Sequence, residues 1–238
     1  MIRVPLGRGA ALLEGVFVDR PNRFLVRAEL DGTLVEAHLA DRGRLTETLV
    51  PGARLVLART PGATRKTQYQ AVAAWRAGML ASVDTQLPNR LVYAALTAGA
   101  LEPFAACDQV RAEFKLGASR FDFLAANAAG ARWIIEVKSA GLEIDGVGLF
   151  PDAPTSRGLR HLAELAELAR SGQPTAVVFV VGSGRARAMR VHRAIDPAFA
   201  AGLVSAAAAG VHVAAYACPL TLEGIVLGPR IPVLDLGE

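Results

Sequence analysis

Lysine, cysteine and aromatic residues are scarce in this sequence of 238 residues. The two cysteines, Cys107 and Cys218, lie far apart without metal-ligand spacing, which argues against a disulfide-stabilised scaffold and a cysteine-based zinc site. The histidines form no cluster with zinc-ligand spacing either. The sequence also lacks a Gly-x-Ser-x-Gly nucleophile elbow and a Walker loop, so the chemistry of those motifs is not predicted.

Long apolar runs are absent as well. Hydrophobic residues make up 52% of the chain, yet no uninterrupted apolar stretch approaches the roughly 20 residues that a membrane helix needs. The N-terminal residues show no apolar segment followed by a small-residue cleavage site. We therefore expect a soluble, cytoplasmic protein without a membrane partner. Its oligomeric state cannot be predicted from these features.

The scarcity of lysine makes each lysine informative. The chain has 23 arginines but only three lysines, which are Lys66, Lys115 and Lys138. An ammonium group can lose its proton or orient a water molecule, whereas a guanidinium stays charged. Lys138 follows Glu136 by two residues at the end of an apolar run, and the two side chains share a face if the run is a strand. A solvated ion pair is the alternative interpretation.

A second carboxylate lies one predicted hairpin earlier. Asp122 stands between Phe121 and Phe123, where a carboxylate is costly to bury unless it is paired or coordinates a metal. If the two runs are neighbouring strands, Asp122 and Glu136 converge on one divalent cation. Glu113 is a further candidate catalytic ligand, with an exposed pair to Lys115 as the alternative. Two acids and a lysine in this arrangement are typical of metal-dependent nucleases.

Positive charge is concentrated in the N-terminal third. Residues 1–80 contain 12 Lys+Arg against 7 Asp+Glu, while residues 81–238 contain 14 against 15. A basic module joined to a neutral one suits a protein that grips a polyanion with one part and holds a metal with the other. The alternative is that arginine is simply the default surface residue of this chain.

The first 80 residues predict a small β-barrel of the OB type. Five short β-like runs are separated by turn signals, and they cover residues 12–18, 23–30, 34–39, 54–58 and 68–75. Asp31-Gly32 is a strong hairpin turn. OB barrels commonly bind nucleic acids. The basic residues expected to contact nucleic acid are Arg23, Arg27, Arg42, Arg44, Arg65 and Lys66, whereas Phe24 is expected in the core.

Residues 81–238 predict an α/β domain with helices on both faces of a sheet. Asn89 is the expected N-cap of a first helix that runs toward Leu101. The other expected helices cover residues 156–170 and 197–209. The expected strands cover residues 110–116, 120–125, 133–139, 175–181 and 211–217.

Three segments of this second domain resemble the sugar fermentation stimulation protein A (SfsA) family. They are Arg120-Phe121-Asp122-Phe123, Ile135-Glu136-Val137-Lys138-Ser139 and the long stretch from Phe150-Pro151-Asp152 to His161-Leu162. Weaker agreement extends through Pro88-Asn89-Arg90-Leu91 and Arg23-Phe24-Leu25. The sequence departs from the family at Leu39-Ala40-Asp41-Arg42-Gly43, where Cys-Pro-Asn-Thr-Gly is common.

The resemblance implies an OB fold followed by a restriction-endonuclease-like PD-(D/E)xK core, with DNA binding as the activity of the family. Asp122 would be the metal-binding aspartate, because Pro151-Asp152 follows the Glu-x-Lys element instead of preceding it. Asp122, Glu136 and the carbonyl of Val137 would hold one or two Mg²⁺ (or Mn²⁺) ions, for which oxygen ligands are suited. Lys138 would orient the attacking water or stabilise charge.

The helix after the Pro-Asp element carries Arg157, Arg160 and His161 at spacings of three and four. They could grip the scissile phosphate, or they could form a solvated face with His161 on the surface. The predicted function is thus a Mg²⁺-dependent nuclease whose barrel grips DNA, with RNA not excluded. The alternative is a non-catalytic DNA-binding regulator of sugar (maltose) metabolism on a nuclease fold.

Overall fold

The computed structural model describes residues 1–60, 62 and 66–236 and divides the chain into two compact units. Residues 3–87 and 220–225 form one unit, which we call the barrel unit. Residues 1–2, 88–219 and those from 226 onward form the other, which we call the α/β unit. The division predicted after residue 80 falls inside strand β7 (Met79–Ser82), which pairs with β6 (Tyr69–Arg76) and so keeps residues 81–87 with the barrel.

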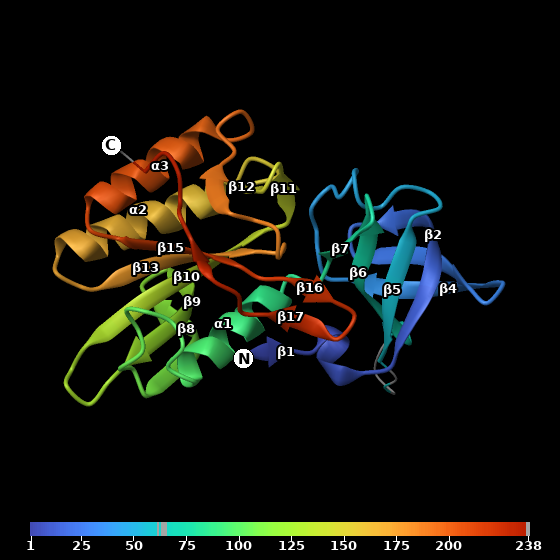
Figure 1. Cartoon of the computed structure of the whole chain (residues 1–238), viewed down its shortest axis with the longest axis horizontal. Coiled ribbons are helices and arrows are strands. Elements are labelled where there is room, and N and C mark those ends of the chain that lie inside the picture. Colours follow the sequence, from blue (N-terminus) through green and yellow to red (C-terminus); the bar gives the residue numbers. More distant parts are fainter. Residues whose placement is uncertain (61, 63–65, 237–238) are drawn as a thin grey trace. The chain divides into compact units, whose positions relative to one another are not determined.

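The barrel unit contains the closed five-stranded barrel that the sequence predicted (Figure 1). Neighbouring strands follow the order β4-β3-β2-β5-β6, and parallel pairing of β4 with β6 closes the barrel. Asp31 and Gly32 both have positive φ, 50° and 75°, as the tight hairpin turn between β3 and β4 requires. The remaining strands are β2 (Leu12–Asn22), β3 (Leu25–Leu30), β4 (Thr33–Leu39) and β5 (Arg54–Arg59).

Alternation along the strands fills the barrel. Val26 and Ala28 of β3 and Ala37 and Leu39 of β4 are fully buried, while the residues between them are exposed or half-buried. The inner residues pack in one apolar cluster with Leu55 and others from the remaining strands. The outward residues between them are therefore available to form a binding surface.

The barrel unit also holds elements that the sequence did not predict. A three-stranded sheet has the order β1-β17-β16, and a 3₁₀ helix follows β1. These strands are two or three residues long, too short to show a periodic pattern. Their bounds are β1 (Arg3–Val4), η1 (Leu6–Gly9), β16 (Leu220–Thr221) and β17 (Gly224–Val226).

The α/β unit is built on a six-stranded sheet with the order β18-β15-β13-β10-β9-β8. Strands β10, β13 and β15 run parallel, while β8, β9 and β18 pair antiparallel with their neighbours. The α/β prediction is confirmed, and five of the six strands were expected. Their bounds are β8 (Gln109–Leu116), β9 (Ser119–Ala126), β10 (Arg132–Ala140), β13 (Thr175–Val181), β15 (His212–Ala217) and β18 (Arg230–Ile231).

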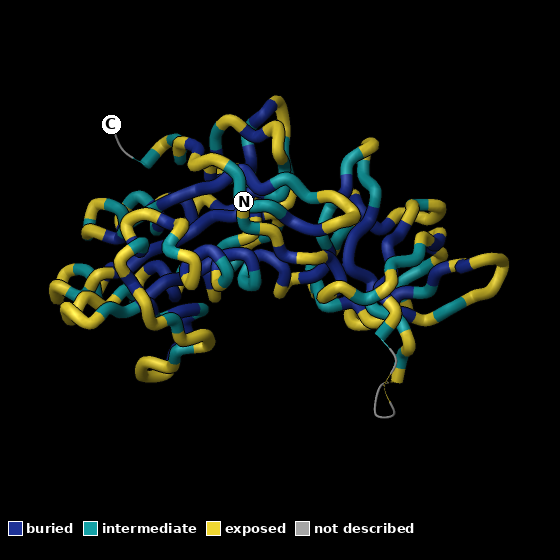
Figure 2. The backbone as a smooth tube through the Cα atoms, turned by 60° about the horizontal axis from the view of Figure 1, so that its bottom comes forward, coloured by how far each residue is buried: buried dark blue, intermediate teal, exposed yellow. Residues whose placement is uncertain are grey.

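Helices α2 (Ser156–Arg170) and α3 (Pro197–Ala208) pack side by side on one face of this sheet (Figure 1). Their apolar residues, such as Leu162 and Phe199, share a buried cluster with Phe179 and Ile134 of the sheet. β13 is buried along its whole length, and dark tube marks such segments in Figure 2. A hydrophobic run with no polar alternation predicts this two-sided burial.

Helix α1 (Leu87–Thr97) contacts β9 on the other face, through the rings of Tyr93 and Phe123 at 6.1 Å. Phe123 pairs with Ile135, which neighbours Ile134 and so points to the opposite side of the sheet from it. The helix begins two residues before the predicted N-cap Asn89, so that prediction is wrong. None of the helices in the described residues is long and apolar enough to cross a membrane.

A smaller sheet follows β10 in the chain. It joins β11 (Leu142–Ile144), β12 (Val147–Phe150) and β14 (Ala188–Val191), with β12 in the centre. The sequence showed only a glycine-rich segment here. A Cβ at Gly148 would lie 2.5 Å from Val181 Cγ1, so glycine permits the close approach of β12 to β13.

Asp196 joins two elements of the α/β unit and supplies a stability test. Its Oδ1 accepts the Phe199 N–H at the start of α3, and its Oδ2 accepts the Thr155 N–H before α2, both at 2.8 Å. Asp196→Ala is expected to lower the free energy of unfolding by about 2 kcal/mol, because it removes a helix cap and orphans a partly buried donor. Urea denaturation measures this loss. Asp196→Asn, which retains a capping oxygen, should lose less, and equal stability of Asp196→Ala and wild type would contradict the assignment.

Candidate functional site

Strands β9 and β10 separate at Asp122. Their pairing runs from Arg132 opposite Ala126 to Ile135 opposite Phe123 and stops there. Beyond that point, Asp122 Oδ2 accepts a 2.7 Å hydrogen bond from the Val137 backbone N–H. A side-chain oxygen thus takes the place of a backbone partner, and the strands open next to the acidic residues.

The same position marks a change of face in β9. Residues two apart in a regular strand share a face. The Phe121 ring, however, lies 5.5 Å from His161 of α2, whereas the Phe123 ring contacts Tyr93 of α1. The irregularity extends to β8, where the residue facing Asp122 in register, Glu113, has a φ of +53°. This local distortion brings Asp122 out of the regular ladder.

Asn89 completes the support of Asp122. Its Nδ2 donates to Asp122 Oδ1 at 2.6 Å from the third position of α1. Both oxygens of Asp122 therefore have fixed donors, one from a helix and one from the backbone of β10. Asn89 orients a site residue instead of capping its own helix.

Glu136 is the centre of the cluster. Its side chain is 7% exposed, and its Oε1 accepts a 2.6 Å hydrogen bond from Lys138 Nζ and lies 2.7 Å from His161 Nδ1. Its Oε2 is buried without a hydrogen-bond partner. The predicted shared face of Glu136 and Lys138 is observed. With Lys138 only 11% exposed, their contact is not the solvated pair of the alternative interpretation.

His161 is 2% exposed, so the alternative interpretation, which placed it on the surface, is wrong. Arg157 and Arg160 on the same helix are exposed, and Arg160 lies 3.8 Å from Glu164. The helix therefore divides the predicted trio, with the histidine in the acidic cluster and the arginines at the surface.

Glu113 does not join the cluster in the described contacts. It is exposed and pairs with Arg120 at 3.1 Å, on the hairpin of β8 and β9. The alternative prediction of an exposed ion pair is closer to the structure, although the partner is Arg120 and not Lys115.

The predicted basic residues of the barrel unit differ in their surroundings. Arg23, Arg42, Arg44 and Lys66 are exposed, whereas Arg27 pairs with Asp19. Arg65 lies outside the described residues. Phe24, expected in the core, is 44% exposed, and the guanidinium of Arg42 lies 4.9 Å from its ring centroid.

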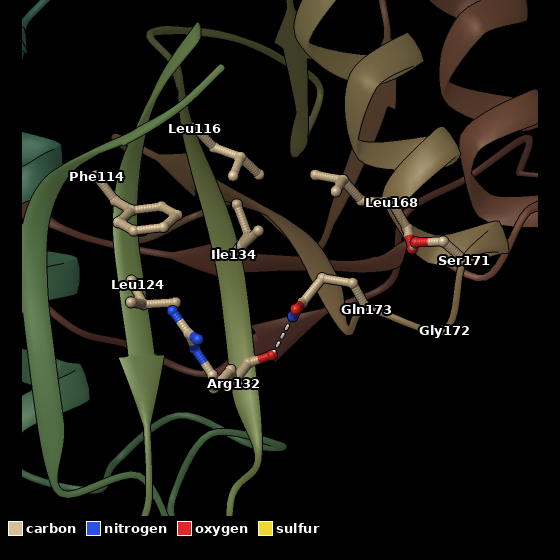
Figure 3. Close-up of a pocket in the computed structure, with 9 residues that line it drawn as sticks. All are labelled: Phe114, Leu116, Leu124, Arg132, Ile134, Leu168, Ser171, Gly172 and Gln173. Carbon is tan, nitrogen blue, oxygen red and sulfur yellow. Dashed lines mark hydrogen bonds between the residues drawn. The ribbon is translucent and has the colours of Figure 1, made fainter.

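Two cavities have linings that include none of the residues of the acidic cluster. One of about 640 Å³ is on the barrel unit and is lined by Asn22, Phe24, Leu25, Glu36, His38, Lys66, Thr67 and Gln70. The other, of about 470 Å³, lies between the β8–β10 strands and the end of α2 (Figure 3). Arg132 and Ile134 line it from the first half of β10, whereas Glu136 and Lys138 lie further along the strand. Figure 3 shows Gln173 donating to the Arg132 carbonyl at its margin.

Comparison with known proteins identifies the family. Residues 18–83 match the family model described as the SfsA N-terminal OB domain, and residues 86–224 match the sugar fermentation stimulation protein RE domain. The chain belongs to the SfsA family. A sugar fermentation stimulation protein homolog of Chloroflexus aurantiacus is 49% identical over 232 residues, covering 98% of this chain and 89% of the relative. The homolog of Chloroflexus aggregans is 47% identical over 233 residues with the same coverage.

A solved structure of the SfsA family has the same fold. The structure of Pyrococcus furiosus SfsA in complex with Ca²⁺ superposes with a TM-score of 0.87 at 28% identity. The match covers 98% of this chain and 99% of that one. The OB barrel followed by an α/β domain is thus shared between the two chains.

Two residues of this SfsA-family site were not predicted in the positions they occupy. Asn89 lies in Pro88–Leu91 and His161 lies in Phe150–Leu162, which are two of the segments that carry the family resemblance. Membership of these segments is the sequence signal that could have linked both residues to the acids. Their contacts depend on tertiary packing, since 33 residues separate Asn89 from Asp122 and 25 separate His161 from Glu136.

Burial and neighbouring charges shift the pKa values of the two acids in opposite directions. Burial, reinforced by the charge of Glu136, raises the pKa of Asp122 to about 6, against the opposing effects of the Val137 N–H, Lys138 and Asn89. Burial acts in the same direction on Glu136, but the contacts with His161 and Lys138 outweigh it and hold its pKa below the ordinary value. The cluster therefore keeps one carboxylate ionised and makes the other easy to protonate.

The donor set fits a hard divalent cation. Glu136 Oε2 is a buried oxygen without a hydrogen-bond partner, and the carboxylates of Asp122 and Glu136 interact electrostatically. The Val137 carbonyl leaves β10 on the same edge as its N–H, which points at Asp122. The described residues contain no group of three or more His, Cys, Asp or Glu placed to hold a metal, so water would supply the other ligands. Mg²⁺ usually retains several waters.

The raised pKa of Asp122 predicts a specific pH dependence of stability. Because the folded-state pKa of about 6 exceeds the ordinary value of 3.8, the folded state loses stability from this group as pH rises through that interval. The loss amounts to about 3 kcal/mol. Asp122→Asn should remove it, so the stability of the variant relative to wild type should increase between pH 4 and pH 7. Urea denaturation in EDTA measures the difference, with the exposed Asp152→Asn as control. Parallel pH profiles of Asp122→Asn and wild type would contradict the prediction.

Proposed function

We propose that this protein binds DNA and hydrolyses its phosphodiester bonds with Mg²⁺ or Mn²⁺ at the cluster of Asp122, Glu136, Lys138 and His161. One observation carries this proposal. Glu136 is buried with one oxygen held by Lys138 and His161 and the other oxygen without a partner. Burial of an ionised carboxylate is costly, so an unpartnered buried oxygen beside a second acid favours a cation ligand.

Asp122, Glu136 Oε2 and the Val137 carbonyl would hold the metal. When bound, Mg²⁺ polarises a phosphate oxygen and lowers the pKa of a coordinated water. An aspartate on one strand and Glu-x-Lys on the next is also the arrangement of PD-(D/E)xK nucleases. The Ca²⁺ complex of the Pyrococcus furiosus protein supports a hard-cation site, because Ca²⁺ also prefers oxygen ligands.

The surrounding residues of the chain position these ligands. Asn89 and the Val137 N–H fix both oxygens of Asp122, while His161 and Lys138 fix Glu136 Oε1 and leave Oε2 available. Such supporting contacts orient metal ligands and tune their basicity. The Lys138 ammonium, which is mostly buried, places positive charge where a phosphate would bind and could orient the attacking water.

The barrel unit would hold the DNA. Its exposed residues Arg23, Arg42, Arg44 and Lys66 can neutralise phosphates, and the release of counterions favours that contact. The exposed ring of Phe24 adds a surface on which a base can stack. On α2, the exposed Arg157 and Arg160 remain candidates for phosphate contacts of the α/β unit.

A non-catalytic DNA-binding regulator is the second candidate. The observation that favours it is the 2.6 Å ion pair between Lys138 and Glu136, because a lysine that pairs with a ligand carboxylate is less available to a phosphate or a water molecule. The lack of a third acid in the described cluster favours it as well. Cleavage distinguishes the two candidates directly.

Labelled single- and double-stranded DNA should be cut in Mg²⁺ or Mn²⁺ and not in EDTA. Asp122→Asn and Lys138→Met should each lower the rate by more than about 100-fold, the scale expected for loss of a transition-state-stabilising group. Glu113→Gln is a matched control, because Glu113 lies outside the cluster, and it should keep its activity. DNA that is bound but not cut with any of these metals would assign the protein to the regulator class.

His161 provides a test that does not depend on turnover. His161→Ala should weaken Mn²⁺ binding by about 10- to 100-fold, because Glu136 loses one of its two supports. Titration calorimetry measures this affinity. His161→Asn, which retains a nitrogen donor near the position of Nδ1, should recover part of it, and the exposed Arg160→Ala should not change it. Equal Mn²⁺ affinity of His161→Ala and wild type would contradict the positioning role.

A further inference from the structure

The cavity of the barrel unit lies where the barrel closes. Leu25 of β3 pairs with His38 of β4, and His38 pairs in turn with Gln70 of β6. Their inward neighbours Val26, Ala37, Leu39 and Ala71 are fully buried, so these three residues face outward and form the floor of the cavity.

Two loops form the sides of the cavity. Asn22 and Phe24 line the cavity from the turn between β2 and β3, and Lys66 and Thr67 line it from the described part of the connection that precedes β6. The barrel has five strands, β2 to β6 in chain order. These two loops connect its first strand to its second and its fourth strand to its fifth. Ligands of OB folds bind between these two connections, on the face of the second and third strands.

The turn holds Phe24 in place at the cavity. Asn22 Oδ1 accepts the Phe24 N–H at 2.9 Å, and the Phe24 carbonyl accepts the Leu39 N–H at 2.8 Å. The residue is nevertheless 44% exposed. Because this fixed and exposed ring lines the cavity, it offers an apolar surface to a ligand there.

Arg20 ties this turn to the loop after β4. Its guanidinium donates to the Arg23 carbonyl of the turn at 3.1 Å and to the carbonyls of Asp41, Gly43 and Arg44 at 3.1, 2.6 and 3.1 Å. These contacts fix the loop that places Arg42 over the Phe24 ring. Arg42 does not line the cavity, whereas Phe24 does, so part of the ring remains open to a ligand. This loop is also where the sequence departs from its family, Asp41-Arg42-Gly43 replacing the common Asn-Thr-Gly.

The lining suits a nucleobase with its phosphate. A cavity of about 640 Å³ lies within the range of small-molecule sites. Phe24 offers a stacking surface, while Glu36, His38 and Gln70 offer acceptors and donors for a base edge. Lys66 offers a cation for the phosphate.

We propose that this cavity binds one unpaired base of a single-stranded nucleic acid, stacked on Phe24 with Arg42 behind the ring. The inference rests on the proposed function and narrows it, because it assigns the barrel unit to single strands. A base inside a duplex has both faces covered by its neighbours and its edge paired, so it cannot enter such a cavity without being unstacked.

Fluorescence anisotropy in EDTA tests the proposal independently of cleavage. The probes are a labelled thymidine oligonucleotide and a duplex of the same length. Phe24→Ala should weaken single-strand binding by about tenfold or more and leave duplex binding unchanged. Phe24→Trp should retain single-strand affinity, and its indole fluorescence should change on binding. Leu34→Ala, another exposed apolar residue on the barrel unit, is the matched control and should bind like wild type.

The outcomes separate this inference from the proposed function. Unchanged single-strand affinity of Phe24→Ala, or an equal loss on both probes, overturns the base site while wild-type binding still supports nucleic-acid recognition. A wild-type protein that binds neither probe overturns both. Loss confined to the single strand, with Phe24→Trp retaining affinity, establishes the base site even if no DNA is cut.

Discussion

The hydrogen bond from the Val137 N–H to Asp122 is the contact on which the site depends. It ends the regular pairing of β9 with β10 and fills the place of a backbone acceptor with a carboxylate oxygen. The strands can then open without an unpaired buried donor. Glu136, Lys138 and His161 occupy the position next to this opening, and Asn89 fixes the remaining oxygen of Asp122. The interruption of the β9–β10 pairing thus brings Asp122 and Glu136 together.

The arrangement of the two acids lowers stability at neutral pH. A carboxylate whose pKa rises to about 6 is destabilising at neutral pH, and the chain tolerates it beside a second buried acid. The two acids have different supporting contacts. Lys138 and His161 both contact Glu136, whereas the hydrogen-bond donors of Asp122 are the uncharged Val137 N–H and Asn89 amide. A divalent cation would relieve this imbalance, because it would stabilise the ionised form of both acids.

The fold and the acidic pair could be predicted from local sequence, whereas their supports could not. Uniform apolar runs such as residues 175–181 and the alternation around residues 34–39 identify strands through side-chain periodicity. The two-residue spacing of Glu136 and Lys138 fixes their common face for the same reason. Asn89 was expected as a helix cap and Phe24 in a core, and both were misplaced. His161 was expected either to contact phosphate or to lie on the surface, and the structure instead buries it against Glu136. Their environments arise from contacts between distant segments, which one residue's identity and neighbours do not encode.

The return of residues 220–225 to the barrel unit affects how the chain must be made. β16 and β17 pair with each other, and β17 pairs with β1 near the N-terminus, although more than 200 residues separate them in the chain. During synthesis the five barrel strands leave the ribosome before the sheet that completes their unit, because β16 and β17 follow the whole stretch 88–219 of the α/β unit. Folding of the barrel unit can therefore finish only after that stretch has been translated, and until then β1 lacks its partner.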